Sequence, residues 1–291
     1  MTGDVLRLQA GRLENKGKAW VPDRPFLAVV GDPVAHSLSP VMQKAALTAR
    51  DLGHEYLALE VAPSDLPDLF SVPGAEHLVG ANVTAPHKEA VAGLCDRLTE
   101  AAARVGAVNT LGRDAEGNWI GHNTDSGGLL MVLGSAWGET PPEGGTVVLG
   151  TGGAARAAVD ALLRWGAARV TVRYHTEAGA GRFREWLKRL GRDDDVGLIP
   201  LQAEVEAGAV LWINALAREI PVSPFLPVAI RAERALLVDL RYGAGVPQEN
   251  YPLGLDVIDG LPLLVMQGGL SFAWWFGPPV PWQEMRQSLG G

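Results

Sequence analysis

The segment Thr146–Val159, which reads TVVLGTGGAARAAV, decides the fold of this chain. Its first four residues are apolar or β-branched, the composition and length of a buried strand. Gly150, Gly152 and Ala155 follow at G-x-G-x-x-A spacing, and an alanine-rich helical run begins at once. The first glycine allows a tight turn, the second lets backbone N–H groups approach a pyrophosphate, and the third small residue lets helix and strand pack closely. The segment predicts a dinucleotide-binding turn, with a strand–turn–helix that binds no ligand as the alternative.

Length and composition indicate a globular protein of two domains. The chain has 291 residues, and about half of them precede the glycine-rich turn. An apolar fraction of 47% and a charged fraction of 20% are typical of folded proteins. The formal net charge of −8 argues against nucleic acid as a partner, because affinity for phosphates needs surplus Lys and Arg. We therefore expect the substrate chemistry in a first domain and the dinucleotide in a second.

Cysteine usage and hydropathy favour the cytoplasm. Cys95 is the single cysteine, so no disulfide forms within the chain, and its apolar surroundings favour a core position over a catalytic thiol. The first 18 residues lack the apolar core of a signal peptide. Leu261–Phe276 is apolar, but it is short and interrupted by Gln267 and two glycines, so we expect no membrane span. No metal site is expected either.

Strands and helices alternate along the first half of the chain, which predicts a largely parallel α/β sheet. We expect Ser39 to be the N-cap of a helix that reaches about Leu52, with Pro40 at its first position. Within the leader, residues 1 to about 25, Val5–Leu8 is a candidate edge strand. The other expected strands are Phe26–Val30, Tyr56–Val61, Leu78–Thr84, Ala107–Leu111 and Trp119–His122, of which the last two form a hairpin. We expect four further helices: a short one capped by Ser64, one from about Ala85 to Leu94, one over Glu100–Arg104 and one that starts at Asn123–Asp125.

The alternation resumes after the glycine-rich turn. Five short apolar runs are spaced as strands, with helical segments between them. The expected strands are Val170–Val172, Val196–Ile199, Ala209–Ile213, Leu236–Leu240 and Asp256–Ile258, and the expected helices are Arg182–Leu190, Leu261–Phe276 and a last one through Leu289.

Polar residues gather at the ends of the first-domain strands. In an open parallel sheet the carboxyl ends of the strands line the crevice where ligands bind. Hydroxyls and amides there, with one lysine and one aspartate, suit a small polyhydroxylated acid. Each residue taken alone has a structural explanation, because Ser39 and Asp125 are also candidate helix caps and Lys88 a candidate solvated residue. The residues are Ser37, Ser39, Asn82, Thr84, Lys88, Asn109 and Asp125.

Six sequence blocks resemble the shikimate dehydrogenase family and occur in its order. They are HSLSP at His36–Pro40, NVTAPHK at Asn82–Lys88, GAVNT at Gly106–Thr110, HNTD at His122–Asp125, GTGGAARA at Gly150–Ala157 and MQGG at Met266–Gly269. The resemblance implies an N-terminal substrate domain, residues 1–124 with about 268–291, and a C-terminal Rossmann doubly wound domain, residues 125–267. It also implies the reversible NADP(H)-linked reduction of 3-dehydroshikimate to shikimate, in aromatic amino acid biosynthesis by way of chorismate.

The same resemblance assigns roles to single residues. Lys88 and Asp125 would be the catalytic proton-transfer pair. The substrate would contact Ser37, Ser39, Thr84, Asn109 and Gln267, with Asn82 close by. Gly150, Gly152, Gly153, Ala154, Ala155 and Asn214 would lie at the cofactor.

The chain departs from the family mainly on the cofactor side. The family's His-Asn after the serine motif is Gln43-Lys44 here, and its Asn-Arg-Thr after the second Rossmann strand is Tyr174–Thr176. NAD sites usually carry an acid about 20 positions beyond the turn, and none precedes Glu177. We therefore predict NADP(H), with Arg173 pairing with the 2′-phosphate and Arg156 assisting. NAD(H) stays open as the alternative because His175 stands where the family has arginine.

Three functions remain open from the sequence. The first is a shikimate dehydrogenase. The second is a dehydrogenase of quinate or another hydroxylated ring acid. The third is a non-catalytic regulator that binds a nucleotide or small acid, which the presence of both Lys88 and Asp125 disfavours. The sequence leaves open whether the chain is a monomer or a homodimer.

Overall fold

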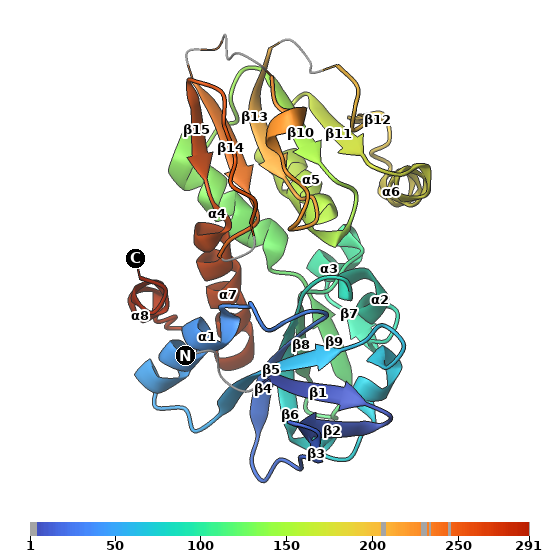
Figure 1. The fold of residues 1–291 in the computed structure, drawn as a ribbon, viewed down its shortest axis with the longest axis vertical. Helices are drawn as coiled ribbons and strands as arrows, with labels where there is room; N and C mark the ends of the chain where they lie inside the picture. Colours follow the sequence, from blue (N-terminus) through green and yellow to red (C-terminus); the bar gives the residue numbers. More distant parts are fainter. Residues whose placement is uncertain (1–4, 205–207, 228–231, 233, 244–245, 291) are drawn as a thin grey trace. The chain divides into compact units, whose positions relative to one another are not determined.

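The computed structural model describes residues 5–204, 208–227, 232, 234–243 and 246–290. The chain divides into two compact units, one of residues 1–124 and 265–291 and the other of residues 125–264. Each unit is built on its own β-sheet (Figure 1). Helix α7 (Gly260–Phe276) contains the second boundary between the units.

The second unit has a six-stranded sheet in which every neighbouring pair is parallel. From β10, the chain adds two strands on one side and then three on the other, giving the order β12-β11-β10-β13-β14-β15. This is the doubly wound Rossmann order. Its elements are α4 (Asp125–Trp137), β10 (Gly145–Leu149), α5 (Gly153–Trp165), β11 (Val170–Tyr174), α6 (Glu177–Arg189), β12 (Val196–Pro200), β13 (Ala209–Asn214), η3 (Ser223–Phe225), β14 (Ala235–Asp239) and β15 (Leu255–Ile258).

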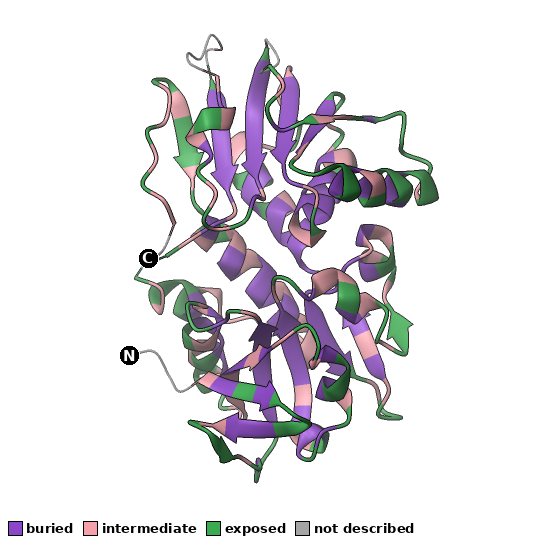
Figure 2. Cartoon of the chain, turned by 45° about the vertical axis from the view of Figure 1, so that its right-hand side comes forward, coloured by how far each residue is buried: buried purple, intermediate pink, exposed green. Residues whose placement is uncertain are grey.

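The central strands of this sheet are buried on both faces. Every residue of β10, β13 and β14 is buried, which explains why these strands are continuous apolar runs rather than alternating ones (Figure 2). Helix α5 lies against β10 through small side chains, among them Ala155 and Ala158, which are fully buried. The third small residue of the glycine-rich turn therefore serves close helix–sheet packing, as the sequence predicts.

The first unit has a nine-stranded mixed sheet in the order β3-β2-β1-β5-β4-β6-β8-β9-β7. Strands β1, β5, β4 and β6 form its parallel core, and β8 joins β6 antiparallel. The strands are β1 (Val5–Gln9), β2 (Arg12–Asn15), β3 (Lys18–Ala19), β4 (Phe26–Gly31), β5 (Glu55–Val61), β6 (Leu78–Val83), β7 (Arg97–Leu98), β8 (Thr110–Arg113) and β9 (Trp119–His122). The helices are α1 (Ser39–Ala49), η1 (Leu66–Phe70), η2 (Ala75–His77), α2 (Lys88–Ala92), α3 (Glu100–Val105) and α8 (Trp282–Gln287).

Most expected elements are confirmed with small shifts of their ends, including the β8–β9 hairpin. The leader differs, because β1 pairs with both β2 and β5 and is therefore an interior strand rather than an edge. The two-residue β3 forms that edge instead. The sequence of β1 did not reveal this, because its second neighbour β5 lies about fifty residues further along the chain.

Two predicted helix caps are wrong. Ser39 is the first residue of α1 and not its N-cap, which is Leu38 and makes no side-chain capping bond. The Oγ atom of Ser37 instead accepts a hydrogen bond from the backbone N–H of Ser39 at 3.2 Å. Ser64 does not cap a helix either, because the 3₁₀ helix η1 has Asp65 at its N-cap position.

Candidate functional site

The loops after β4 and β6 meet at the carboxyl end of the first sheet. The backbone N–H of Asp32, after β4, donates to the carbonyl of Ala85, after β6, at 3.2 Å. The N–H of Thr84 donates back to the carbonyl of Val30 at 2.8 Å. From β4 the chain adds β5 on one side and β6 on the other, so this edge is a topological switch point, where open α/β sheets bind ligands.

A cluster of buried amides and hydroxyls lies beside β6 and β8, and we call it the polar network. The amide of Asn82 donates to Ser271 Oγ at 2.9 Å, and the amide of Asn109 donates to Gln267 Oε1 at 3.2 Å. Asn109 also donates to Thr124 Oγ1 at 2.9 Å and accepts from the backbone N–H of Thr124 at 2.8 Å. The network therefore joins Asn82, Asn109 and Gln267, three of the residues that the sequence predicts at the substrate.

The hydroxyl groups of Ser271 and Tyr56 also belong to this network, although the sequence does not predict either residue at the site. Ser271 Oγ contacts Thr110 Oγ1 at 2.8 Å and donates to the carbonyl of Gln267 at 3.0 Å. Tyr56 donates its phenolic O–H to Asn82 Oδ1 at 2.7 Å. Ser271 stands four positions after Gln267, so both lie on one face of α7, and this spacing is the one signal that pointed to it.

Lys88 and Asp125 each begin a helix next to the polar network. Lys88 is the first residue of α2, and its carbonyl accepts from the N–H of Val108, the neighbour of Asn109, at 2.7 Å. Asp125 is the first residue of α4, is buried and directly follows Thr124 of the network. Both helix starts are thus connected, through backbone contacts or the chain itself, to the Val108–Asn109 segment.

The predicted hydroxyl donors follow the carboxyl ends of β4 and β6. Ser39 is buried, whereas Ser37 and Thr84 are half-buried. A Cβ placed on Gly31, the last residue of β4, would overlap Cγ2 of Thr84, so Thr84 lies directly against the end of that strand. The first-unit residues predicted at the substrate therefore lie at the carboxyl end of the sheet or in the polar network beside it.

In the second unit, the glycine-rich turn lies at the switch point between β10 and β13. Gly150 has φ of +111°, and a Cβ there would come within 2.7 Å of the carbonyl oxygen of Ala215. Gly152 is the N-cap of α5 without any side-chain capping bond, and a Cβ there would meet no atom within 4 Å. The turn thus leaves open space before the helix N-terminus, where N–H groups bind phosphates, and this geometry fits a dinucleotide.

The structure contradicts the role predicted for Arg173. This residue is only 2% exposed, and its guanidinium donates to the carbonyl of Phe225 at 2.9 Å and to those of Leu201 and Ala203. Arg173 therefore holds two loops of the second unit and does not present its charge to a 2′-phosphate. The exposed side chains at the end of β11 are His175 and Thr176, and Thr176 also caps α6 by accepting from the N–H of Gly179 at 3.1 Å.

Two further residues predicted at the cofactor face inward. Arg156 is 5% exposed, and its guanidinium carbon lies 5.8 Å from the centroid of the Trp186 ring. Asn214 is fully buried, donates to Asp239 Oδ1 at 2.9 Å and accepts from the N–H of Leu216 at 3.1 Å. The side-chain hydrogen bonds of Asn214 are therefore made within the protein, and they hold the loop at Ala215 that lies against Gly150.

In the first unit, burial shifts the pKa of Cys95 and that of His87. Cys95 lies just after α2, packs against the core and donates to the carbonyl of Val91 at 3.2 Å. Burial, with a smaller contribution from Asp96, raises the pKa of its thiol to about 11. Burial lowers the pKa of His87, although a contact with the Val61 carbonyl at 2.7 Å opposes this shift. Cys95 is therefore half-buried against the core, and its raised pKa disfavours the thiolate that a nucleophile requires.

No helix among the described residues is long and apolar enough to cross a bilayer. Within those residues, no group of three or more His, Cys, Asp or Glu side chains is arranged to hold a metal ion.

Similarity to known proteins extends over both units of this chain. Residues 29–111 match the family model described as the shikimate dehydrogenase substrate binding domain. A shikimate dehydrogenase (NADP(+)) from Magnetococcus marinus is 34% identical over 273 residues, which cover 91% of this chain and 95% of that protein.

Two crystal structures extend the comparison. The shikimate 5-dehydrogenase of Thermus thermophilus in complex with NADP(H) and shikimate has a TM-score of 0.72 and 34% identity, covering 91% of this chain and 98% of that one. The enzyme from Listeria monocytogenes in complex with shikimate and NAD has a TM-score of 0.72 and 26% identity, covering 94% of this chain and 100% of that one. With a relative above 30% identity along nearly its whole length, this chain belongs to the shikimate dehydrogenase family.

Proposed function

We propose that this chain is an NADP-linked shikimate dehydrogenase, which reversibly reduces 3-dehydroshikimate to shikimate. The observation that carries the proposal is the polar network, in which Asn82, Asn109 and Gln267 are hydrogen-bonded beside the helix that starts at Lys88. Buried amides and hydroxyls of this kind suit the several ring hydroxyls of the substrate. The first unit is then the substrate domain and the second the dinucleotide domain.

The proposed mechanism divides the work between Lys88 and the substrate-binding hydroxyls. A bound nicotinamide would supply the hydride chemistry at the carbinol carbon. Lys88 exchanges the proton of the reacting hydroxyl and, as an ammonium, stabilises negative charge that develops on that oxygen. Asp125 orients Lys88 and balances its charge. Ser37, Ser39 and Thr84 hold the substrate, and two neutral serine donors bind its carboxylate without a buried counter-charge.

The dinucleotide is proposed to bind along the glycine-rich turn. Gly150, Gly152, Gly153, Ala154 and Ala155 would hold the pyrophosphate at the start of α5. With Arg173 bonded to loop carbonyls, we expect the exposed His175 and Thr176 to meet the adenosine 2′-phosphate. An imidazole cannot offer a phosphate the two parallel N–H donors of a guanidinium, so we expect only a modest preference for NADP over NAD.

The compartment and assembly are also part of the proposal. A single, half-buried thiol suits a reducing compartment such as the cytoplasm. The active unit is a monomer or a homodimer with a small hydroxy acid as its substrate.

Steady-state assays of the purified chain test the proposal. Rates would be compared for shikimate and quinate, each with NADP⁺ and NAD⁺. We expect the highest kcat/KM for shikimate with NADP⁺. A higher value for quinate would assign a different ring acid. Tight binding of shikimate without turnover of any ring acid would favour a regulator.

A further inference from the structure

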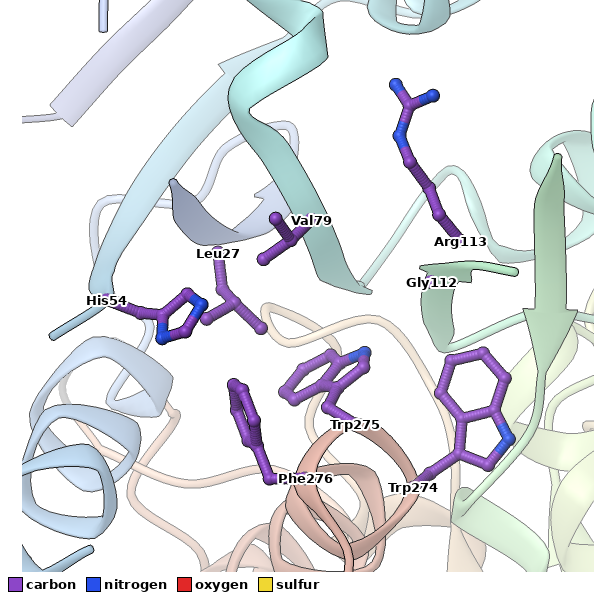
Figure 3. A pocket seen from close by; sticks show the side chains of 8 residues that line it. All are labelled: Leu27, His54, Val79, Gly112, Arg113, Trp274, Trp275 and Phe276. Carbon is purple, nitrogen blue, oxygen red and sulfur yellow. The ribbon is translucent and has the colours of Figure 1, made fainter. Parts of the chain in front are cut away.

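The first unit contains a cavity, and four of its eight lining residues carry aromatic rings (Figure 3). Its volume is about 350 Å³, within the range of small-molecule sites. The lining residues are Leu27, His54, Val79, Gly112, Arg113, Trp274, Trp275 and Phe276, and we call it the aromatic pocket.

The aromatic pocket is separate from the substrate site of the first unit. Leu27 and Val79 are the second residues of β4 and β6, whereas the predicted substrate residues follow the carboxyl ends of those strands. At about 3.3 Å per residue, Thr84 lies roughly 16 Å along the strand direction from Val79. The pocket therefore lies near the amino ends of these strands, away from the substrate residues, and the substrate does not fill it.

The aromatic walls are held in place by contacts outside the pocket. Trp275 donates its indole N–H to the carbonyl of Leu111 at 2.8 Å, and Trp274 stacks on His122 with ring centroids 5.2 Å apart. A Cβ on Gly112 would come within 2.5 Å of the Trp274 ring, so the indole occupies space that a side chain would fill. Trp274, Trp275 and Phe276 are each half-buried, and Figure 3 shows their rings around one cavity.

His54 is the polar group of this wall. Its ring lies 5.2 Å from that of Phe276, and Figure 3 shows the imidazole directed towards the cavity. Its Nδ1 atom is buried and has no hydrogen-bond partner. Because Nδ1 is closed off, the outer ring nitrogen, Nε2, is the one that a ligand's hydrogen-bonding group would meet.

Arg113 does not supply an anion site here. Its guanidinium donates to the carbonyls of Leu78, Gly117 and Ala75 and lies 4.1 Å from the centroid of the Trp119 ring. Figure 3 shows it pointing away from the aromatic rings. Only the aliphatic part of Arg113 borders the cavity, so the pocket favours an uncharged ligand.

We propose that the aromatic pocket is a second small-molecule site, which binds a neutral planar aromatic compound of one or two rings whose hydroxyl or ring N–H hydrogen-bonds to His54. The flat π-faces of the indoles select a planar ring over a saturated one. The site does not depend on the dehydrogenase activity, and its occupancy is measured without substrate or dinucleotide.

Calorimetric titrations of the full chain test the site with phenol, anisole and cyclohexanol. Anisole keeps the ring and lacks the donor, whereas cyclohexanol keeps the hydroxyl and lacks the flat ring. We expect phenol to bind about two- to tenfold more tightly than anisole or cyclohexanol. This affinity ratio corresponds to the loss of one hydrogen bond or of one ring–ring contact. His54→Phe should weaken phenol by a similar factor and leave anisole unchanged. The matched control His77→Phe, on η2, should change neither.

Three results would overturn the proposal. They are equal affinities for phenol and cyclohexanol, a phenol affinity that His54→Phe does not change, and displacement of phenol by saturating shikimate. If His54→Phe does not fold, a crystal of the wild-type chain soaked in a brominated phenol decides the matter. Anomalous density between Trp274 and His54 supports the site, and bromine density only elsewhere contradicts it.

Discussion

The side-chain amide of Asn109 donates to Gln267 Oε1 at 3.2 Å, across 158 positions of sequence. This bond ties α7 to the start of β8, because Asn109 directly precedes that strand. The amide oxygen of Asn109 accepts from the N–H of Thr124, the residue before Asp125. One asparagine therefore connects the helix that carries Gln267 with the segment that leads to the proposed catalytic aspartate.

Gln267→Ala should both weaken substrate binding and lower the free energy of unfolding. The substitution removes an acceptor of the buried Asn109 amide and a proposed substrate contact. We expect KM for shikimate to rise about tenfold and the free energy of unfolding to fall by about 1–2 kcal/mol. Steady-state kinetics and urea unfolding measure the two effects. Gln287→Ala on the exposed face of α8 is the control, and equal behaviour of the two variants would remove Gln267 from the site.

Ser39→Ala should raise KM more than it lowers kcat. Ser39 is buried at the first turn of α1, and a carboxylate bond there is made in both the ground state and the transition state. Loss of such uniform binding raises KM and leaves kcat nearly unchanged. An unchanged KM for shikimate would show that the substrate carboxylate binds elsewhere.

Arg173→Met should destabilise the second unit without changing cofactor preference. Its guanidinium bonds three loop carbonyls, so we expect a loss of about 3 kcal/mol in the free energy of unfolding. The exposed Arg189→Met is the control for stability. The ratio of kcat/KM for NADP⁺ to that for NAD⁺ should stay within about twofold in Arg173→Met.

His175→Arg should raise that same ratio. A guanidinium at the exposed end of β11 can bind a phosphate with two N–H donors, which an imidazole cannot. We expect an increase of about tenfold or more, consistent with one charge-assisted bond pair. If Arg173→Met changes the ratio of kcat/KM for NADP⁺ to that for NAD⁺ and His175→Arg does not, the 2′-phosphate binds at Arg173 instead.

Cys95 should react slowly with thiol reagents in the folded chain. Its pKa of about 11 lies above the ordinary value, so the reactive thiolate is scarce at pH 8 and increases as the pH rises towards 11. Relative to an ordinary thiol, we expect labelling about 200-fold slower at pH 8, from the thiolate fractions alone. Stopped-flow labelling in buffer and in denaturant measures the difference. Equal rates in the two conditions would contradict the raised pKa of Cys95.

Local sequence was sufficient where the fold depends on local contacts. The glycine-rich turn and the apolar strands β10, β13 and β14 were predictable, because a continuous apolar run between turn residues is what a strand buried on both faces requires. The Asn82, Asn109 and Gln267 motifs pointed to residues that the polar network then joined.

Partners far along the chain account for what the sequence did not reveal. Arg173 was expected to meet a phosphate because it ends a strand beside the turn, but its acceptors Leu201, Ala203 and Phe225 lie 28 to 52 residues further on. Ser271 was overlooked because its partner Asn82 is 189 positions away. The one-residue error at the N-cap of α1 has a local cause instead, because Ser37 supplies the acceptor for the N–H of Ser39.

The most direct test of the proposed function is the turnover of Lys88→Ala with shikimate and NADP⁺. Loss of a general acid–base should lower kcat by about 10²–10⁴-fold, while the affinity for NADP⁺, measured by calorimetry, stays within about twofold. Lys188→Ala, an exposed lysine of α6, should keep wild-type kinetics. Near-normal kcat in Lys88→Ala would contradict the assignment and return Lys88 to a solvated residue in the first turn of α2.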